Sequence, residues 1–169
     1  YFRNHTRLLA LLGGFGHWAE QVNRDLYFAR HSIGFLSRFP ILDVRRYRLP
    51  GRIPGRGLLV ADVDVSGARV AIAVGHLSLG PRDRVRQMLY IGEVVSRLPG
   101  RTILMGDFNC TSDSEEMRFI SARTGLRSAL DHMPTYPSWR PERDIDHVLV
   151  SEGITIRRAR TLDLPLSDH

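Results

Sequence analysis

Three segments carry apolar residues at the spacing of an α-helix, and each is bounded by residues that start or stop helices. The clearest begins at Pro81, a residue suited to the first helical position, and Gly100 lies just beyond its end. In the most N-terminal segment four leucines form the apolar stripe, and a Gly-Gly pair follows it. In the third, Ser112 or Asp113 can cap the first turn. The predicted helices are Asn4–Leu12, Pro81–Leu98 and Asp113–Arg123.

Shorter runs of apolar residues, alternating or continuous, predict strands. Val63 and Val65 alternate with acidic residues, and the Ser66-Gly67 pair that follows favours the turn of a β-hairpin. Strands and helices alternate irregularly along the chain, with hairpins among them, which favours an α/β fold with mixed sheets. The predicted strands are Ile33–Ser37, Leu58–Val65, Arg69–Leu77, Thr102–Met105, Ile145–Val150 and Ile154–Arg160.

Length and composition are those of one globular domain. The chain has 169 residues, of which 43% are hydrophobic and 25% charged. No segment approaches the roughly 20 apolar residues that span a bilayer. We therefore expect a single domain over residues 1–169, and a monomer.

The ends and the cysteine content say little about the compartment. The chain starts at Tyr1, and no basic-then-apolar signal pattern follows. A single cysteine, Cys110, excludes an internal disulfide and is expected to be a small buried side chain. These features slightly favour a cytoplasmic location.

The chain is basic, with a formal net charge of +6 and a pI near 10.4. Such a charge suits a polyanionic partner or a phosphate-bearing substrate, and arginine binds phosphate through two parallel hydrogen bonds. All 24 basic residues are arginine, so a coding bias toward arginine explains the same composition. Arg38, Arg52, Arg56 and Arg140 are candidates to contact phosphate, and an ordinary surface role is the alternative for each.

Polar residues that can perform chemistry follow an apolar strand at Gly106-Asp107-Phe108-Asn109. Asp107 offers a hard oxygen ligand or a proton acceptor, and Asn109 can donate or accept hydrogen bonds. Gly106 allows the backbone to turn tightly. Taken alone, the motif is equally typical of a capped turn.

Three further motifs place titratable residues at strand ends. Asp146 lies at the start of the strand that leads to Val150, and His76 lies at the end of the strand that starts at Arg69. Asp168 and His169 close the chain. Each motif also has an ordinary explanation by itself. Asp146 can be a surface acid, His76 a hydrogen-bonded core histidine, and Asp168-His169 a pair without a function.

Together, the order and spacing of these motifs resemble the endonuclease/exonuclease/phosphatase superfamily, which includes DNase I, abasic-site endonucleases and sphingomyelinases. The resemblance covers nearly the whole chain. The matching segments are Leu36–Ile41, Arg56–Leu59, His76-Leu77 with Arg84 and Gln87, Gly106–Asn109, Thr135–Pro137, Ile145–His147 and Ser167–His169.

The resemblance implies a DNase I-like four-layer α/β/β/α sandwich of two mixed sheets, with the active site at one end of the sheets. It also implies hydrolysis of phosphodiester or phosphomonoester bonds with Mg²⁺ or Mn²⁺. Such an ion neutralises charge that develops on the phosphoryl oxygens and the leaving group.

Residue by residue, His169 resembles the family's catalytic histidine, a general base or a contact to the phosphate. Asp146 resembles the carboxylate that fixes the tautomer of this histidine and raises its pKa. Asp107 and Asn109 resemble the pair that orients the attacking water and the scissile phosphate.

The resemblance also assigns the metal site and a second histidine. Asp168 and Asp107 are its expected metal-binding residues. His76 resembles the second histidine of the DNase I and sphingomyelinase branches, where it contacts the phosphate. This histidine argues against the abasic-site endonuclease branch.

The chain departs from the family pattern in two ways. The family's Asn and metal-binding Glu lie upstream of the segment that matches Asn4–Leu12, so we expect both to be missing, together with the first strands. The family also continues beyond His169 into a final strand. On this basis the fold is expected to be incomplete and the chain alone inactive. The Arg30–Ile33 segment further replaces a Gly-Asn pair that is frequent in the family.

Three functions remain open from the sequence. The first is the metal-dependent phosphoesterase, acting on nucleic acid, phospholipid or a small phosphate ester. The second is a non-catalytic module derived from this family that binds a phosphate or a protein. The third is a basic nucleic-acid-binding protein, which would leave the ordered acid, amide and histidine motifs unexplained.

Overall fold

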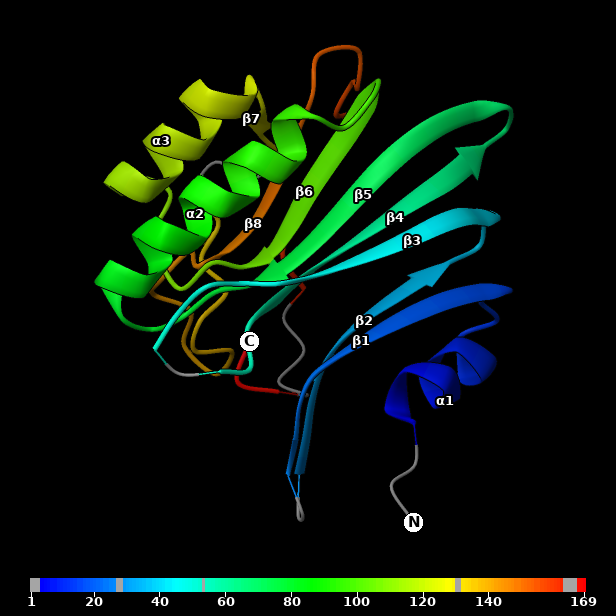
Figure 1. Ribbon diagram of the computed structural model, residues 1–169, viewed down its shortest axis with the longest axis horizontal. Helices are drawn as coiled ribbons and strands as arrows, with labels where there is room; N and C mark the ends of the chain where they lie inside the picture. Colours follow the sequence, from blue (N-terminus) through cyan, green and yellow to red (C-terminus); the bar gives the residue numbers. More distant parts are fainter. Residues whose placement is uncertain (1–3, 27–28, 53, 130–131, 163–166) are drawn as a thin grey trace.

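The computed structural model describes residues 4–26, 29–52, 54–129, 132–162 and 167–169. A helix lies outside a two-stranded sheet, a six-stranded sheet faces that pair, and two helices cover the far side (Figure 1). The predicted four-layer α/β/β/α sandwich is confirmed. None of the described helices is long and apolar enough to cross a membrane. The elements are α1 His5–Leu12, β1 His17–Leu26, β2 Ala29–Ser37, β3 Ile41–Arg48, β4 Gly57–Val65, β5 Ala68–His76, α2 Pro81–Ser96, β6 Arg101–Asp107, α3 Glu115–Thr124, β7 Arg127–Ser128 and β8 Asp146–Val150.

The larger sheet is mixed and has the strand order β3-β4-β5-β6-β8-β7. Its neighbours pair antiparallel except β5 and β6, which are parallel because α2 carries the chain back across the sheet between them. The smaller sheet is, among the described residues, the antiparallel pair β1-β2. The two sheets lie face to face (Figure 1). The last residues of β5 and β6 and the first residue of β8 lie side by side at one end of the sandwich.

Successive side chains of the central strands point to opposite faces of the larger sheet, and both faces are apolar. On one face, side chains of α2 and α3 pack over Leu58, Val60 and Leu104. The other face packs against the β1-β2 pair, and the side chains that meet there are Ala19, Ile33 and Phe35 from one sheet and Leu59, Ala61 and Val63 from the other.

The structure confirms the predicted N-terminal and central helices and the hairpin, and it corrects the cap of the third helix. α3 begins at Glu115, and the Ser114 hydroxyl accepts a hydrogen bond from the Met117 amide. The predicted cap was Ser112 or Asp113. Because the helix begins at Glu115, the residue at the N-cap position is Ser114, and the Asp113 carboxylate accepts a hydrogen bond from the Thr111 hydroxyl.

The predicted strand Ile154–Arg160 is wrong, because this segment forms no strand. Its alternating pattern is real, but β8 already pairs with β6 on one edge and with β7 on the other. No neighbouring edge is left for another strand beside β8. Three strands were not predicted: β1 and β3, which are rich in polar residues, and β7, which has only two residues.

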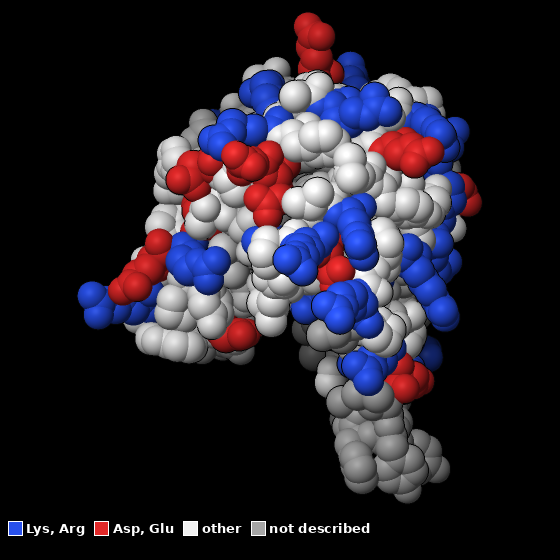
Figure 2. All heavy atoms as spheres, turned by 60° about the vertical axis from the view of Figure 1, so that its left-hand side comes forward, with Lys and Arg blue, Asp and Glu red and all other residues white. Residues whose placement is uncertain are grey.

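The basic side chains of the chain are interspersed with acidic ones. On the face seen in Figure 2, Asp and Glu side chains lie among the arginines. Several arginines form ion pairs, including Arg45 and Arg69 with the fully buried Asp62. These arginines therefore have a structural role in the fold.

A close backbone contact holds β5 and β6 together where they reach the end of the sandwich. Gly106 has a φ of 138°, and a Cβ at this position would lie 1.9 Å from the carbonyl oxygen of Gly75. Only glycine fits this approach, for both steric and conformational reasons.

We expect Gly106→Ala to destabilise the fold by about 2–5 kcal/mol, since it combines backbone strain with a clash that only strand separation relieves. Gly16→Ala is the matched control, because its Cβ would meet nothing within 4 Å. Chemical denaturation of both variants measures the difference. Equal stability of the two would show that the β5–β6 contact is not a constraint.

Candidate active site

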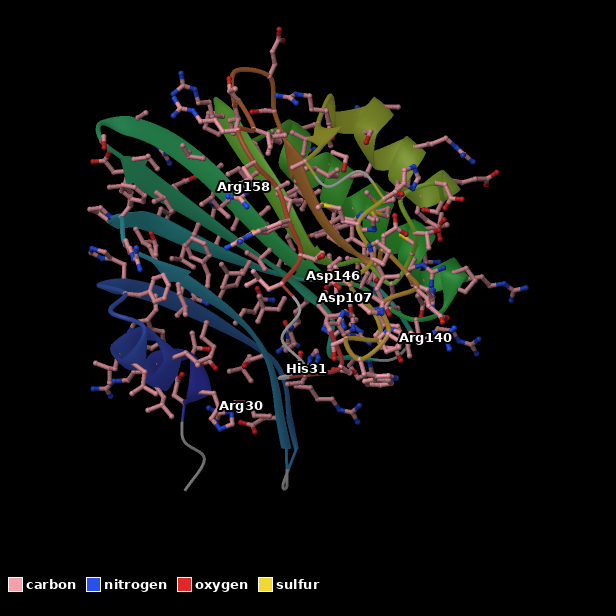
Figure 3. All side chains as sticks on the ribbon, turned by 180° about the vertical axis from the view of Figure 1, so that it is seen from behind. Arg30, His31, Asp107, Arg140, Asp146 and Arg158 are labelled. Atoms are coloured by element: carbon pink, nitrogen blue, oxygen red, sulfur yellow. The ribbon has the colours of Figure 1, made fainter. Side chains whose placement is uncertain are left out.

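Strand register brings three predicted site residues into one row. His76 pairs with Asp107 across β5 and β6, and Asp107 pairs with Asp146 across β6 and β8. By alternation all three side chains share the face of Met105, which is directed toward the β1-β2 sheet. Figure 3 shows Asp107 and Asp146 next to each other at this end of the sandwich.

His169 joins this row through a hydrogen bond to Asp146. Its Nδ1 lies 2.7 Å from Oδ2 of Asp146. Because a carboxylate can only accept, Nδ1 carries the proton, and Nε2 of the neutral ring keeps its lone pair. This Nε2 lies 4.0 Å from Oδ2 of Asp107. The Thr135 hydroxyl also donates to Asp146, and the Tyr136 ring lies 5.0 Å from the His169 ring, so both groups fix the position of the pair.

The surroundings of His169 favour its protonated form. Partial burial lowers the pKa of His169, but the hydrogen bond and charge of Asp146 outweigh it, and the charges of Asp107 and Asp168 add to the rise. The net pKa therefore lies above its ordinary value. A raised pKa makes the neutral ring a stronger base.

Asp107 and Asn109 form a short loop directly after β6. Asn109 adopts a φ of 53°, a left-handed conformation that asparagine tolerates well. Its main-chain N–H donates to Oδ1 of Asp107 at 2.9 Å, and its side-chain N–H₂ donates to the Leu77 carbonyl and to Asp107. The side-chain carbonyl of Asn109 is thereby left to accept a hydrogen bond from a ligand.

The Asp107 carboxyl group is held in its ionised form. Burial raises its pKa, but the hydrogen bonds from His76 and the Asn109 amide, with the charges of His76 and His169, outweigh this effect. The pKa of Asp107 lies below its ordinary value as a result.

His76 has two competing partners at a single nitrogen. Its Nε2 lies 3.2 Å from Oδ2 of Asp107 and also contacts Nη1 of Arg56. Asp107 needs a proton on this nitrogen, whereas Arg56 needs a lone pair, so both bonds cannot form together. An anionic oxygen that accepts from both Arg56 and His76 would remove the conflict. The ring of His31 packs 5.1 Å from the ring of His76.

These groups surround an open cavity of about 480 Å³. All five predicted catalytic residues and Asp168 line it, and carboxylates, imidazoles, an amide and two arginines share its wall. The lining residues are Arg56, His76, Leu79, Asp107, Asn109, Tyr136, Arg143, Ile145, Asp146, Asp168 and His169.

A comparison of the sequence with models of protein families identifies the family of this chain. The model of the endonuclease/exonuclease/phosphatase family matches residues 3–169. The chain belongs to the endonuclease/exonuclease/phosphatase family. Membership supports a phosphoesterase- or nuclease-type hydrolytic function, and members of this family generally use divalent metal ions. The chain has no significant match among the curated proteins.

Solved structures of the same fold resemble the chain at low sequence identity. Beta toxin from Staphylococcus aureus has a TM-score of 0.69 at 14% identity and is matched over 88% of this chain and 68% of its own. The human nocturnin catalytic domain, solved with a bound sulfate, gives 0.66 at 20% identity, over 90% and 66%. The mannosyl-6-phosphatase Bt3783 of Bacteroides thetaiotaomicron gives 0.59 at 17% identity, over 73% and 57%. The chain thus spans roughly two thirds or less of the length of these structures.

For this member of the family, the described residues do not complete a metal site by themselves. No group of three His, Cys, Asp or Glu side chains in the described part of the chain is placed to hold a metal ion. The oxygens of Asp107 and Asp146 already accept hydrogen bonds. Asp168 is exposed, lines the cavity and makes no hydrogen bond through its carboxylate to a described residue, so it is the available ligand. The metal-binding roles predicted for Asp107 and Asp168 stay predictions.

Of the four arginines proposed from the sequence, the structure places one at the site. Arg56 lines the cavity, whereas Arg38 lies over the ring of Phe15 and Arg140 pairs with Glu142 at the surface. Arg52 is exposed and does not line the cavity, and its main-chain amide donates a hydrogen bond to Asp83. Figure 3 shows Arg140 directed away from Asp107 and Asp146.

Three residues near the site were not among the predicted site residues. Arg143 and Tyr136 line the cavity, and His31 reaches His76 from β2. Tyr136 lay in a segment of the family resemblance, and the segment of His31 had been noted as a departure from it. Arg143 was one of many arginines, and only the fold distinguishes it.

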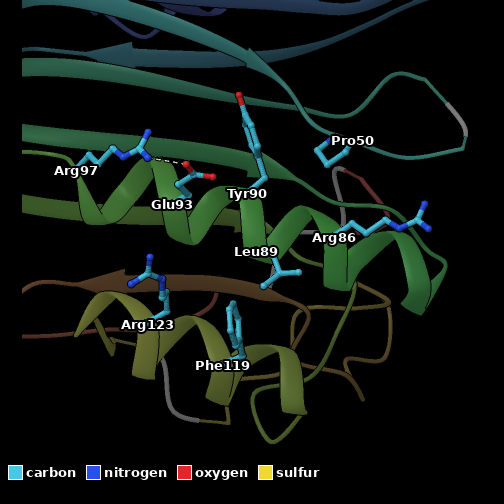
Figure 4. A pocket seen from close by; sticks show the side chains of 8 residues that line it. All are labelled: Pro50, Arg86, Leu89, Tyr90, Glu93, Arg97, Phe119 and Arg123. Atoms are coloured by element: carbon cyan, nitrogen blue, oxygen red, sulfur yellow. Dashed lines mark hydrogen bonds and ion pairs between the residues drawn. The ribbon is translucent and has the colours of Figure 1, made fainter.

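A cavity of similar volume between α2 and α3 lacks this chemistry (Figure 4). It is lined by three arginines and by apolar side chains such as Leu89 and Phe119, and its single carboxylate, Glu93, pairs with Arg97. No histidine faces it. The cavity beside Asp107 is therefore the candidate active site.

We expect Asp146→Asn to lower the pKa of His169, because both the hydrogen bond to the carboxylate and its charge are lost. Asp168→Asn is the matched control and should lower this pKa less, since it removes only a weaker charge interaction. NMR titration of the His169 ring measures both values. If the two variants lowered the pKa equally, Asp146 would not be the partner that controls His169.

Proposed function

We propose that this chain is a phosphoester hydrolase in which His169, oriented by Asp146, activates the attacking water. The observation that carries this proposal is the Asp146–His169 hydrogen bond of 2.7 Å, which leaves the basic Nε2 beside Asp107 in the cavity. A histidine oriented by a carboxylate is the usual arrangement of a general base. Family membership supports the same class of reaction.

In this scheme a water molecule lies between His169, Asp107 and Asn109. Nε2 of His169 takes one proton from the water, and the Asp107 carboxylate accepts a hydrogen bond from the other. The Asn109 side chain lies beside Asp107 and helps to orient the ligand. The new P–O bond forms as the bond to the departing oxygen breaks, and the departing oxygen takes up a proton. His76 can donate that proton through the nitrogen that faces Asp107.

Arg56 and His76 are proposed to bind the phosphate oxygens. Their contact at one nitrogen is unfavourable when His76 is protonated, and an anionic oxygen between them accepts a hydrogen bond from each. Arg143 lines the same cavity and adds a second guanidinium group. The sulfate in the nocturnin structure and the phosphatase activity in the name of Bt3783 support a tetrahedral anion as the ligand.

A requirement for a divalent ion, Mg²⁺ or Mn²⁺, belongs to this proposal. When bound, the ion supplies positive charge to the phosphoryl oxygens and the leaving group. Asp168 is the carboxylate of the cavity that is available to hold it.

The alternative is a non-catalytic module that binds a phosphate or a partner protein with the same residues. The observation in its favour is that the described residues do not complete a metal site. This module would bind phosphate in the cavity without turnover.

We expect the protein to hydrolyse at least one phosphoester and His169→Ala to reduce the rate about 10²–10⁴-fold, as loss of a general base does. His5→Ala on the outer helix α1 is the control and should keep full activity. The panel is bis(p-nitrophenyl) phosphate, p-nitrophenyl phosphate, plasmid DNA, single-stranded RNA, sphingomyelin and inositol phosphates. Hydrolysis that survives in His169→Ala would contradict the assigned role. Phosphate binding without hydrolysis would support the binding module.

We expect EDTA to abolish hydrolysis and added Mg²⁺ or Mn²⁺ to restore it. Asp168→Asn should raise the metal concentration needed for half-maximal rate, because it removes one carboxylate ligand. Asp64→Asn, on a hairpin turn away from the cavity, is the control. Activity that is insensitive to EDTA would refute the metal requirement.

A further inference from the structure

A second open cavity lies beside the candidate active site, and the Asp146–His169 pair separates the two. Both residues line each cavity. The second cavity has a volume of about 740 Å³, which exceeds that of the first. A molecule whose phosphorus atom lies next to His169 can therefore extend one of its ester groups into this space.

The wall of the second cavity is mainly apolar and contains one cation. Pro134, Pro141, Leu162 and Trp139 supply the apolar surface. Trp139 is 71% exposed, so most of its indole surface is free to contact a ligand. Arg160 also lines the cavity and makes no hydrogen bond or ion pair with any residue that the structure describes.

Two of the three side-chain hydroxyl groups of this wall are already engaged, and the third belongs to Thr161. The Thr135 hydroxyl donates to Asp146, and the Ser138 hydroxyl donates to the Ser167 carbonyl. A sugar, which needs several hydrogen-bonding partners, therefore finds few here. The one carboxylate of the wall, Asp146, is bound to His169, so a cationic lipid head group would meet Arg160 without a free acid. A flat, uncharged ring suits the exposed indole and the guanidinium of Arg160 better.

The loop that carries Trp139 is attached to the segment that carries the catalytic histidine. The Ser138 amide donates to the Asp168 carbonyl at 2.9 Å, and the ring of Tyr136 packs on that of His169. The position of Trp139 is thus linked to that of His169. A group stacked on Trp139 would be held at a defined place relative to the reacting phosphate.

We propose that Trp139 and Arg160 form a nucleobase-binding subsite, which makes the substrate a nucleotide or nucleic-acid phosphoester. The base stacks on the indole of Trp139, and Arg160 contacts the base edge or the neighbouring phosphate. This subsite rests on the proposed function, because it assumes that the phosphate lies beside His169.

Binding to Trp139 can be observed directly by fluorescence. The chain has two tryptophans, so Trp18→Phe leaves Trp139 as the sole indole. In that variant we expect adenosine 5′-monophosphate to quench the emission, whereas ribose 5-phosphate, which lacks the base, does not. Calorimetry should show that the nucleotide binds roughly 5- to 100-fold more tightly than ribose 5-phosphate, the range expected for stacking one base.

Trp139→Ala should weaken nucleotide binding to the level of ribose 5-phosphate and leave binding of ribose 5-phosphate unchanged. Trp139→Phe should retain part of the difference, and Arg140→Ala, at the neighbouring surface position, should have no effect. Equal affinity of the wild type for both ligands would overturn the subsite, as would an equal loss for both ligands in Trp139→Ala.

Binding of adenosine, which has a base but no phosphate, distinguishes failure of the base subsite from failure of the phosphate site beside His169. If adenosine quenches Trp139 but neither phosphate compound binds more tightly than adenosine, the base subsite stands and the phosphate site beside His169 fails. If ribose 5-phosphate binds and loses affinity in Arg56→Ala while neither adenosine nor the nucleotide quenches Trp139, the phosphate site stands and the base subsite is wrong.

Discussion

The close approach of β5 and β6 at Gly75 and Gly106 is the contact on which the rest of the site depends. It keeps the parallel pairing intact up to the last residues of both strands, where His76 lies opposite Asp107. The antiparallel pairing of β6 with β8 then places Asp146 next to Asp107. A side chain at position 106 would separate the strands at the point where these groups must be within hydrogen-bonding reach. The row of functional residues is therefore a consequence of backbone packing, and the loops add to a geometry that the sheet has already set.

This row places two carboxyl groups close together, and basic groups pair with them unevenly. His169 neutralises Asp146 through a well-formed hydrogen bond. Asp107 shares His76 with Arg56, and that arrangement cannot satisfy both partners at once. On the side of Asp146 the hydrogen bonds are thus complete, whereas on the other side Arg56 and His76 lack a shared acceptor. This asymmetry is what a site for an anion requires, because the ligand supplies the acceptor that the protein lacks.

The sequence predicted the parts of the fold in which local pattern and burial agree. The helix that begins at Pro81 and the hairpin around Ser66-Gly67 have clear apolar periodicity and clear boundaries. β1 and β3 were missed because their exposed positions carry many polar residues, and β3 lies at the edge of the larger sheet. The segment Ile154–Arg160 has the opposite character, since it has the alternation of a strand but no partner. Strand formation there depends on a free edge, which local sequence cannot reveal.

Some residues of the candidate site could likewise be predicted from local sequence motifs, whereas others are placed there only by the fold. Motif order indicated His76, Asp107, Asn109, Asp146, Asp168 and His169, and the structure brings all six to one cavity. The arginines could not be assigned in this way, because every basic residue is an arginine and local sequence does not show which of them faces the site. Arg56 and Arg143 differ from Arg140 only in where the fold directs them. The loop of Trp139 makes the point most clearly, because Ser138 connects it to Ser167 and Asp168, far along the chain. His169 and the adjoining cavity are thereby parts of one hydrogen-bonded unit, and we expect a change in either loop to alter the geometry of both.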